Sequence, residues 1–270
     1  MRTFDVVMKT EYGTSYNSYL VQGTEKTALI EAVHREYLDY LLENLRDTDG
    51  FHGIDCLVMN HNEPDHSGAI AKLLELYPNL KIYATQSGSI FLKNITNRPD
   101  LNVTVVKDGD TLDLGGKTLT FISAPFLHWP DSMFTYLRED RILFTCDFLG
   151  AHYCEPQMFD HAIRYRAAYD EAFRGYYDAI FGPFPSYVRN GLDRFAALDV
   201  DLVAPSHGPM LQRAAGDRRL EIPRVERAGR RRRKENPRFL LQRLREHAPD
   251  RRTYCGRHSR CSAGRVGPRL

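Results

Sequence analysis

Six consecutive residues, His61-Asn62-Glu63-Pro64-Asp65-His66, place four metal-binding side chains almost next to one another. Imidazole nitrogens and carboxylate oxygens are common protein ligands of zinc and iron. The segment follows the apolar run Ile54–Met59 (IDCLVM), which predicts a buried strand. Open α/β folds carry their chemistry at the carboxyl ends of strands, so a metal site is expected here. The alternative is a polar turn, stiffened by Pro64, that caps the next helix.

Three further ligand-type side chains also follow short strand-like runs. His128 comes after Lys117–Ser123, Asp147 after Arg141–Cys146, and His207 after Asp201–Ala204. Any one of these residues alone would be an ordinary surface or core residue. With the first cluster, however, they place His, Glu or Asp at four separate strand ends. This pattern indicates loops that converge on a metal site.

The pattern resembles the metallo-β-lactamase fold and, within it, the flavodiiron proteins. The metal-binding domain of that family carries His-x-Glu-x-Asp-His, then a distant His, an Asp and a final His. In this chain 61 residues separate His66 from His128, 18 more precede Asp147, and 59 more precede His207. The segments Thr14–Tyr19 and His128–Met133 are also similar to the family. The resemblance covers about residues 2 to 211, and with the alternating short strands and helices it predicts an α/β fold, a four-layer αββα sandwich.

The resemblance implies a site for two iron ions, with the ligands divided between them. One iron would be bound by His61, Glu63 and His128, the other by Asp65, His66 and His207, and Asp147 would bridge the two. His152, five residues after Asp147, is a candidate for hydrogen bonding near the metals. The alternative for His152 is an ordinary loop histidine.

The resemblance also implies an oxidoreductase that reduces dioxygen to water, nitric oxide to nitrous oxide, or both. Hydrolases of the same fold usually carry a second His where this chain has Glu63, and most use zinc to activate water. A carboxylate there makes the site harder and more anionic, which suits iron that cycles between Fe(II) and Fe(III). A zinc-dependent hydrolase and a metal-binding remnant without turnover are the alternatives.

The charge of the chain is divided unevenly. The 270 residues carry a net charge of +2, but residues 212–270 contain 18 Arg and one Lys against six acidic residues, a balance of +13. The remaining residues therefore carry −11. The run Gly229–Lys234 (GRRRRK) is typical of a nucleic-acid-binding arm or of a disordered extension, and nucleic acid is not the favoured partner. We predict a diiron domain over residues 1–211 and an Arg-rich tail over residues 212–270, disordered or produced by a frameshift.

The flavodiiron proteins continue at this point into a flavodoxin-like domain that binds FMN, and the tail contains no recognisable domain of that kind. With permitted codons, a one-nucleotide shift can turn Ile222–Ala228 into a sequence similar to the helix before the flavodoxin domain. The same shift can turn Gln242–Ala248 into a sequence similar to its phosphate loop. We therefore expect a separate flavoprotein or a rubredoxin-like protein to donate electrons. A head-to-tail homodimer, as in the family, is expected to be weakened.

Other features set the expected cellular context and the limits of the fold. Relatives usually begin with a further strand ahead of the segment that matches Phe4–Tyr19, so an exposed sheet edge is expected.

Cys56 and Cys146 lie in predicted strands and are expected to be buried thiols, and the five cysteines show no zinc spacing. No secretory signal or long apolar span occurs, which favours a reducing cytoplasm. Gly116-Lys117-Thr118 resembles the end of a P-loop, but the segment is predicted to be a hairpin.

Overall fold

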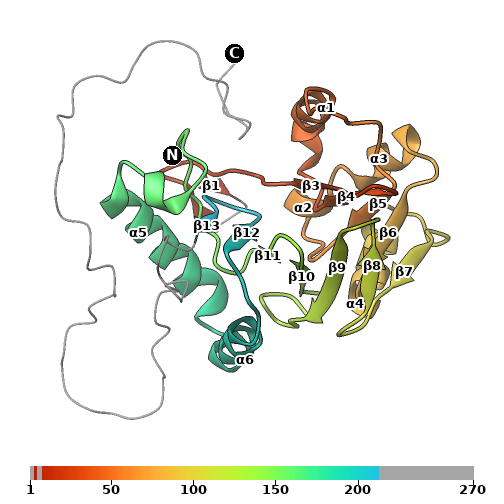
Figure 1. Cartoon of the computed structure of the whole chain (residues 1–270). Coiled ribbons are helices and arrows are strands. Elements are labelled where there is room, and N and C mark those ends of the chain that lie inside the picture. Colours follow the sequence, from red (N-terminus) through yellow and green to blue (C-terminus); the bar gives the residue numbers. More distant parts are fainter. Residues whose placement is uncertain (1–2, 5–7, 213–270) are drawn as a thin grey trace.

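Two β-sheets pack face to face and helices cover their outer faces (Figure 1). The computed structural model describes residues 3–4 and 8–212. The frameshift and disorder predictions for the Arg-rich tail fall on residues that lie, apart from Gln212, outside this part. The αββα sandwich predicted from the sequence is confirmed.

The first sheet has the strand order β3-β4-β5-β6-β7. Its strands are β3 (Tyr19–Gln22), β4 (Thr27–Ile30), β5 (Cys56–Val58), β6 (Lys81–Ala84) and β7 (Val103–Val105). β3 and β4 are antiparallel, whereas β4 to β7 run parallel. Among the described strands β3 and β7 form the two edges of this sheet. The outer face packs against three helices, α1 (Leu38–Arg46), α3 (Ile70–Leu76) and α4 (Gln86–Ile95).

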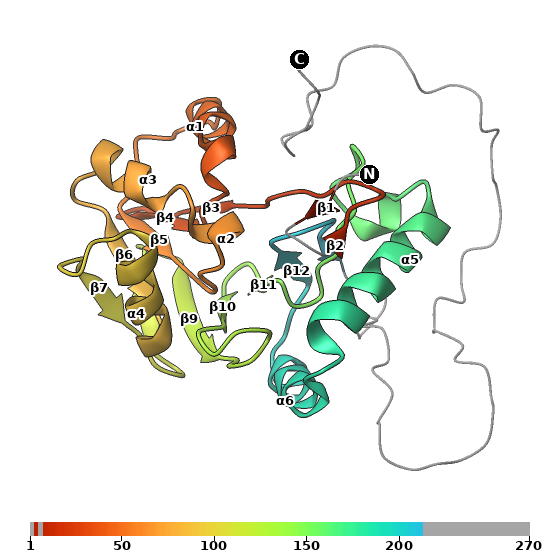
Figure 2. The same cartoon turned by 180° about the vertical axis from the view of Figure 1, so that it is seen from behind.

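The second sheet has the strand order β13-β12-β11-β10-β9-β8. Its strands are β8 (Thr111–Asp113), β9 (Thr118–Ser123), β10 (Met133–Leu137), β11 (Ile142–Cys146), β12 (Leu202–Pro205) and β13 (Leu211–Gln212). β8 and β9 form the hairpin predicted around Gly116. Two helices, α5 (Arg166–Tyr176) and α6 (Pro185–Ala196), lie on the opposite side of the molecule from α1, α3 and α4 (Figure 2).

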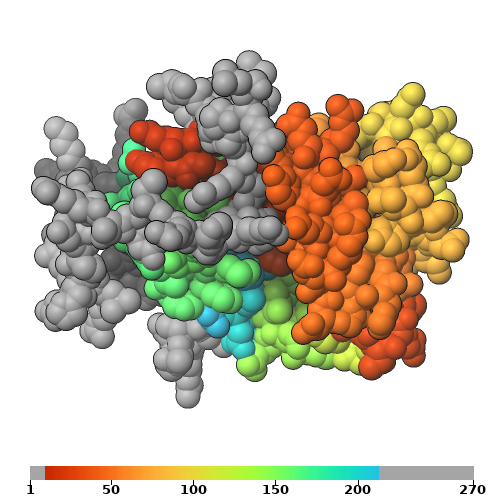
Figure 3. Space-filling view, turned by 90° about the horizontal axis from the view of Figure 1, so that it is seen from above, coloured from red at the N-terminus to blue at the C-terminus, as the bar shows by residue number. Residues whose placement is uncertain are grey.

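Shorter elements complete the described part of the chain. A separate two-stranded sheet pairs β1 (Thr3–Phe4) with β2 (Met8–Lys9). Single turns of helix are η1 (Arg35–Tyr37), α2 (Pro64–Ser67) and η2 (Asp160–Ala162), and a π-helical segment, η3 (Tyr177–Phe181), continues α5. In the space-filling view, the residues of the first sheet and its helices, coloured orange to yellow, gather on one side of the molecule (Figure 3).

Side-chain alternation explains how the layers form. Leu57 in β5 points to the helices, whereas Cys56 and Val58 point to the second sheet. All three residues are buried because β5 is covered on both faces. On α1, four leucines recur at helical spacing and all are buried. The predicted buried thiols, Cys56 and Cys146, are each 1% exposed.

Candidate metal centre

The cluster that follows β5 folds into an extended residue and one turn of helix. Glu63 has extended backbone angles, and Pro64 occupies the first position of α2, where its missing N–H costs nothing. The Ser67 hydroxyl lies 2.9 Å from the Asn62 carbonyl oxygen and 3.0 Å from that of Glu63, and it donates there. The segment is a turn, as the polar-turn alternative expected, but no side chain caps α2 or the helix Ile70–Leu76 that follows, and the turn directs the ligand-type side chains inward. Asp65 and His66 are both buried.

The first ligand group gathers side chains from three loops. Its potential ligand atoms all lie within 4.8 Å of one another and belong to His61, Glu63, His128 and Asp147. Glu63 Oε2 lies 3.4 Å from His61 Nε2 and 3.2 Å from His128 Nε2. His61 is fully buried, whereas 23% of the Glu63 side chain is exposed. This group is therefore the one with an edge toward solvent.

The second ligand group lies beside the first and is more deeply buried. It consists of Asp65, His66 and His207. Asp65 Oδ2 lies 3.2 Å from His66 Nε2 and 3.0 Å from His207 Nε2. Loops after β5 and β12 supply these residues, as the strand ends predicted.

Asp147, directly after β11, lies between the two groups. Its Oδ2 atom is 3.2 Å from His128 Nε2 and 3.7 Å from His61 Nε2. Its Oδ1 atom is 3.1 Å from His66 Nε2 and 3.4 Å from His207 Nε2. Each carboxylate oxygen thus faces a different group. The structure brings together all seven side chains that the sequence singled out as ligands.

The donor atoms fit metal ions better than they fit one another. Both carboxylate oxygens of Asp65, Nε2 of His66 and Oδ1 of Asp147 are buried, and none makes a hydrogen bond of acceptable direction. This holds although the N···O distances fall as low as 3.0 Å. A buried polar atom without a hydrogen bond costs about 1–3 kcal/mol. These four atoms converge on a common space without bonding to one another, and the first group offers its own nitrogen and oxygen atoms within 4.8 Å of one another, so the residues fit a metal pair.

Outer contacts fix the direction of two histidines. His61 Nδ1 lies 3.2 Å from Asp131 Oδ1, and Asp131 Oδ2 accepts hydrogen bonds from the backbone N–H and the side-chain amide of Asn62. His207 Nδ1 donates to the Ser15 carbonyl oxygen at 2.6 Å. A partner at Nδ1 leaves Nε2 to face a metal, which is the usual arrangement behind ligand histidines. The roles of Asp131 and Ser15 were not predicted from the sequence.

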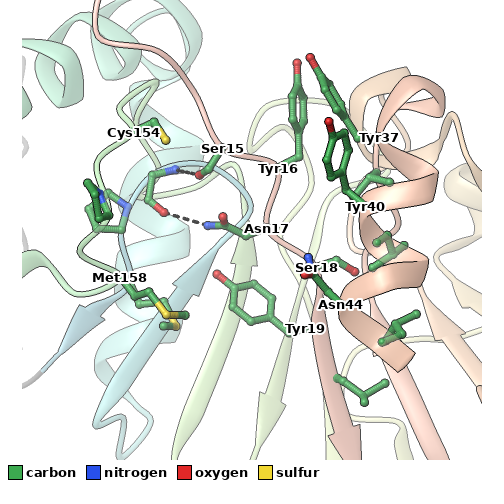
Figure 4. Close-up of a pocket in the computed structure, with 18 of the residues that line it drawn as sticks. Ser15, Tyr16, Asn17, Ser18, Tyr19, Tyr37, Tyr40, Asn44, Cys154 and Met158 are labelled. Atoms are coloured by element: carbon green, nitrogen blue, oxygen red, sulfur yellow. Dashed lines mark hydrogen bonds between the residues drawn. The ribbon is translucent and has the colours of Figure 1, made fainter. Parts of the chain in front are cut away.

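The segment that contains Ser15 also holds the loop of His207 in place. Ser15 Oγ accepts a hydrogen bond from Gly208 N, and Asn17 Nδ2 donates to the Gly208 carbonyl oxygen (Figure 4). Asn17 Nδ2 also donates to the Pro205 carbonyl oxygen. These contacts border a cavity of about 470 Å³ between α1 and the residues around Met158. They give a physical role to the segment 14–19, which the sequence linked to the family without explaining it.

The charges of the ligand-type side chains compensate one another. Burial lowers the pKa of His61, but hydrogen bonds with Asp131 and Glu63 outweigh burial and raise it well above its usual value. For Glu63, burial raises the pKa, yet hydrogen bonds with His128 and His61 outweigh burial and lower it to about 2. The pKa of Asp147 is likewise lowered well below its usual value, because nearby imidazoles outweigh burial. Protons on the imidazoles therefore balance the carboxylates until ions replace them.

His152, predicted as a neighbour of the metals, is buried close to the second group. Its ring centroid is 4.9 Å from that of His207, and its Nδ1 lies 2.9 Å from Thr14 Oγ1. Burial lowers the pKa of His152 to about 3, so the imidazole is neutral. Tyr176, which the sequence did not single out, stands edge-on to His152 at 4.8 Å. Its position at the end of α5 gives no sequence signal, because a tyrosine there also fits ordinary core packing.

The fold and the site define a class: a metallo-β-lactamase-like αββα domain with a candidate centre for two metal ions. The family model described as "ODP family beta lactamase" matches residues 14–208. The chain therefore belongs to this family, which is that of the flavodiiron proteins. No helix in the described part has the length and apolar character needed to cross a membrane.

The match covers most of this chain but only part of each relative. The "Flavo-diiron protein FprA2" of Clostridium acetobutylicum is 56% identical over 214 residues, which are 79% of this chain and 53% of the relative. An "Anaerobic nitric oxide reductase flavorubredoxin" of Vibrio vulnificus is 41% identical over 206 residues, or 74% of this chain and 41% of the relative. The chain thus spans about half the length of the curated relatives it matches, or less.

Solved structures give the same result. The flavodiiron protein of Giardia intestinalis matches with a TM-score of 0.74 and 29% identity, over 80% of this chain and 52% of that one. The rubredoxin oxygen:oxidoreductase of Desulfovibrio gigas matches with a TM-score of 0.72 and 32% identity, over 77% and 52%. Both similarities support the fold and the family.

Proposed function

We propose that the chain is the diiron domain of a flavodiiron-type oxidoreductase that reduces dioxygen to water, nitric oxide to nitrous oxide, or both. The observation that carries the proposal is the position of Asp147, whose two oxygens face two separate ligand groups. Similar proteins named nitric oxide reductase flavorubredoxin and rubredoxin oxygen:oxidoreductase support this proposed activity. Glu63, in place of the histidine common in hydrolases of this fold, supports iron rather than zinc.

The proposed ligands follow the two groups. His61, Glu63 and His128 would hold one iron, Asp65, His66 and His207 the other, and Asp147 would bridge them. The chemistry that a bound pair of irons supplies is electron transfer to a diatomic molecule at open coordination positions. The protein itself contributes no nucleophile to this reaction, so the roles of its other residues are orientation and exclusion of water.

The surrounding residues suit those roles. Asp131 holds His61 from behind and Ser15 holds His207, so both imidazoles are oriented before ions bind. Trp129 packs edge-on against His61, with ring centroids 5.0 Å apart, and shields the first group. The neutral imidazole of His152 and the buried ring of Tyr176 close the site beside His207. Because these side chains exclude water, electrostatic interactions inside the site are stronger.

The proposed source of electrons is a flavin on another domain or protein. The family implies FMN, and the relatives are about twice as long as the matched part. We propose a reduced flavoprotein or a rubredoxin-like protein as donor, a cytoplasmic setting, and a homodimer as the assembly to test. We also propose that residues 1–211 form the diiron domain and that residues 212–270 form a separate Arg-rich tail, with nucleic acid not favoured as its partner.

Metal analysis and an assay that starts with addition of nitric oxide or dioxygen to the anaerobic protein together test the proposal. The chain is expressed with iron supplied, and elemental mass spectrometry is expected to find about two irons per chain. With reduced flavodoxin as donor, consumption of nitric oxide or dioxygen is expected, and Asp147→Ala should abolish it. Zinc uptake with ester hydrolysis in the absence of a reductant would favour the hydrolase instead.

A further inference from the structure

The outer contact of His66 differs from those of His61 and His207, because it is a hydrogen bond with the Cys146 side chain and not with a carboxylate or a carbonyl oxygen. The Nε2 atom of His66 faces the metal space, since it lies 3.2 Å from Asp65 Oδ2 and 3.1 Å from Asp147 Oδ1. Ligand histidines almost always donate their other ring N–H to a carboxylate, a carbonyl oxygen or water. The surroundings of the imidazole on its other side therefore need an explanation.

A third cluster of ligand-type atoms shares His66 with the second metal-binding group and adds two residues from outside both groups. A carboxylate oxygen of Glu31, a ring nitrogen of His66 and the sulfur of Cys146 lie within 4.8 Å of one another. All three residues are at most 2% exposed. Neither Glu31 nor Cys146 has a role in the proposed function.

The backbone and side chain of Glu31 are held from several sides. Its N–H donates to the Val58 carbonyl oxygen, and its own carbonyl oxygen accepts from the Ser18 hydroxyl. Its φ angle is +60°, in a region that non-glycine residues rarely adopt. One carboxylate oxygen, Oε1, accepts the Asn60 N–H at 2.8 Å. The other, Oε2, is buried without a hydrogen bond, so it can accept a further donor.

Cys146 links this cluster to the bridging carboxylate. It is the last residue of β11, directly before Asp147, and its φ angle is +51°. Two residues of one cluster thus adopt the left-handed region without being glycine. Such conformations persist where the surrounding structure fixes them, and they are common at functional sites.

We infer that Glu31, together with Cys146, is the outer support of His66. The His66 ring hydrogen-bonds with the Cys146 sulfur, the Cys146 thiol donates its own proton to Oε2 of Glu31, and this relay keeps Nε2 of His66 directed at Asp65 and Asp147. Each metal-binding group then contains one histidine with an acidic residue behind it, His61 with Asp131 and His66 with Glu31. Glu31 and Cys146 are positioning residues, and the inference rests on the proposed metal centre.

A purely structural role for Glu31 is the competing explanation, because Oε1 already anchors Asn60. Glu31→Gln separates the two roles. Glutamine keeps an oxygen that can accept the Asn60 N–H, whereas its amide nitrogen replaces Oε2 and cannot accept a proton. Cys56→Ala is the matched control for Cys146→Ala, since both thiols are 1% exposed and both lie in strands, but Cys56 belongs to no ligand group.

Anaerobic titration of the full-length, ion-free chain with cobalt(II), followed by absorption, tests the inference. Cobalt(II) reports ligand geometry without requiring iron or activity. The wild type is expected to bind two ions. Glu31→Gln should weaken one of them about 10–100-fold and alter its absorption bands, as loss of an outer partner does. Cys146→Ala should act on the same ion, and Cys56→Ala on neither.

Three results would overturn the inference. Unchanged affinities and bands in Glu31→Gln would show that His66 does not depend on this carboxylate. Equal weakening of both ions, with a lower melting temperature of the ion-free variant, would assign Glu31 to the fold alone. A wild type that binds no ion would contradict both the proposed metal centre and the inference. A wild type that binds two ions, with an unchanged Glu31→Gln variant, would contradict the inference only.

Discussion

Asp147 is a carboxylate that is 2% exposed, and such a group is tolerated only when it is paired. Four imidazole nitrogens lie within 3.7 Å of its two oxygens. Burial would raise the pKa of Asp147, but these imidazoles lower it instead. The side chain is therefore anionic and directed at both groups before any ion arrives, which is a condition for a bridging ligand.

Replacing Asp131 by Asn should loosen the first ligand group. The amide no longer offers a negative charge to His61 Nδ1, and loss of such a partner usually costs about 10–100-fold in metal affinity. The expected result is weaker binding of one ion, with the other unchanged, in a calorimetric titration. Asp108→Asn is a suitable control, because Asp108 accepts the backbone N–H of Ser123 at the surface, away from the site. Equal binding by both variants would contradict the assignment of Asp131.

Ion binding should release protons and should weaken as the pH falls. In the ion-free chain the pKa of His61 and of His66 is raised well above 6.5. A raised folded-state pKa contributes stability that is fully present below the unfolded value and is lost as the pH rises through the raised value. The ion-free chain should therefore lose stability in that window, whereas ion affinity should increase. Calorimetry in two buffers of different ionisation enthalpy measures the release, and identical heats in both would refute it.

The sequence predicts those residues of the candidate site that are recognisable by their type and by their position at strand ends. The seven proposed ligands stand out because His, Glu and Asp rarely follow apolar runs so regularly. Asp131 and Glu31 do not stand out, since a lone carboxylate looks like any surface residue in a sequence. Only burial reveals them, and burial is decided by packing between distant segments.

The elements that position the site were largely predictable, and the exceptions have physical reasons. β9 and β11 match the predicted runs Lys117–Ser123 and Arg141–Cys146 to within one residue, because their apolar runs are short and bounded by turns. α4 was missed because it begins with Gln86-Ser87-Gly88-Ser89, which are weaker helix formers than alanine or leucine. It forms because Thr85 caps it and because it packs against the ligand loop. A Cβ at Gly88 would lie 2.8 Å from Asn62 Nδ2, so only glycine allows this approach.

Two glycine substitutions should change stability in opposite directions. A Cβ at Gly23, in the turn between β3 and β4, would lie 2.0 Å from the Leu114 carbonyl oxygen. That oxygen accepts the N–H groups of Glu25 and Lys26, so Gly23→Ala must displace the contact between the two sheets. We expect a loss of about 1–3 kcal/mol in the free energy of unfolding.

Gly175, in α5, is the matched case, because a Cβ there would meet no atom within 4 Å. Gly175→Ala should add about 0.5–1 kcal/mol through helix propensity. Urea denaturation measures both changes. If both variants shifted the midpoint in the same direction, the packing argument for Gly23 would be wrong.

At the scale of the whole molecule, the described part has its own core. One apolar cluster fills the space between the sheets, and one lies under the helices on each outer face. All seven proposed ligands come from residues 61–207. The opposite charges of residues 1–211 and 212–270 nevertheless allow electrostatic attraction between the two parts, which salt would screen.

Truncation after Gln212 should therefore leave the metal centre and the stability of the domain intact. The core and the ligands lie ahead of that point, so the shortened chain is expected to bind as many ions as the full chain. Its melting temperature should agree within about 2–4 °C, the shift that 1 kcal/mol produces in a domain of this size. Elemental analysis and differential scanning calorimetry, each at low and at high salt, compare the two chains. A shortened chain that binds fewer ions would show that the tail contributes to the centre. A lower melting temperature at low salt alone would show that the Arg-rich tail binds the acidic domain.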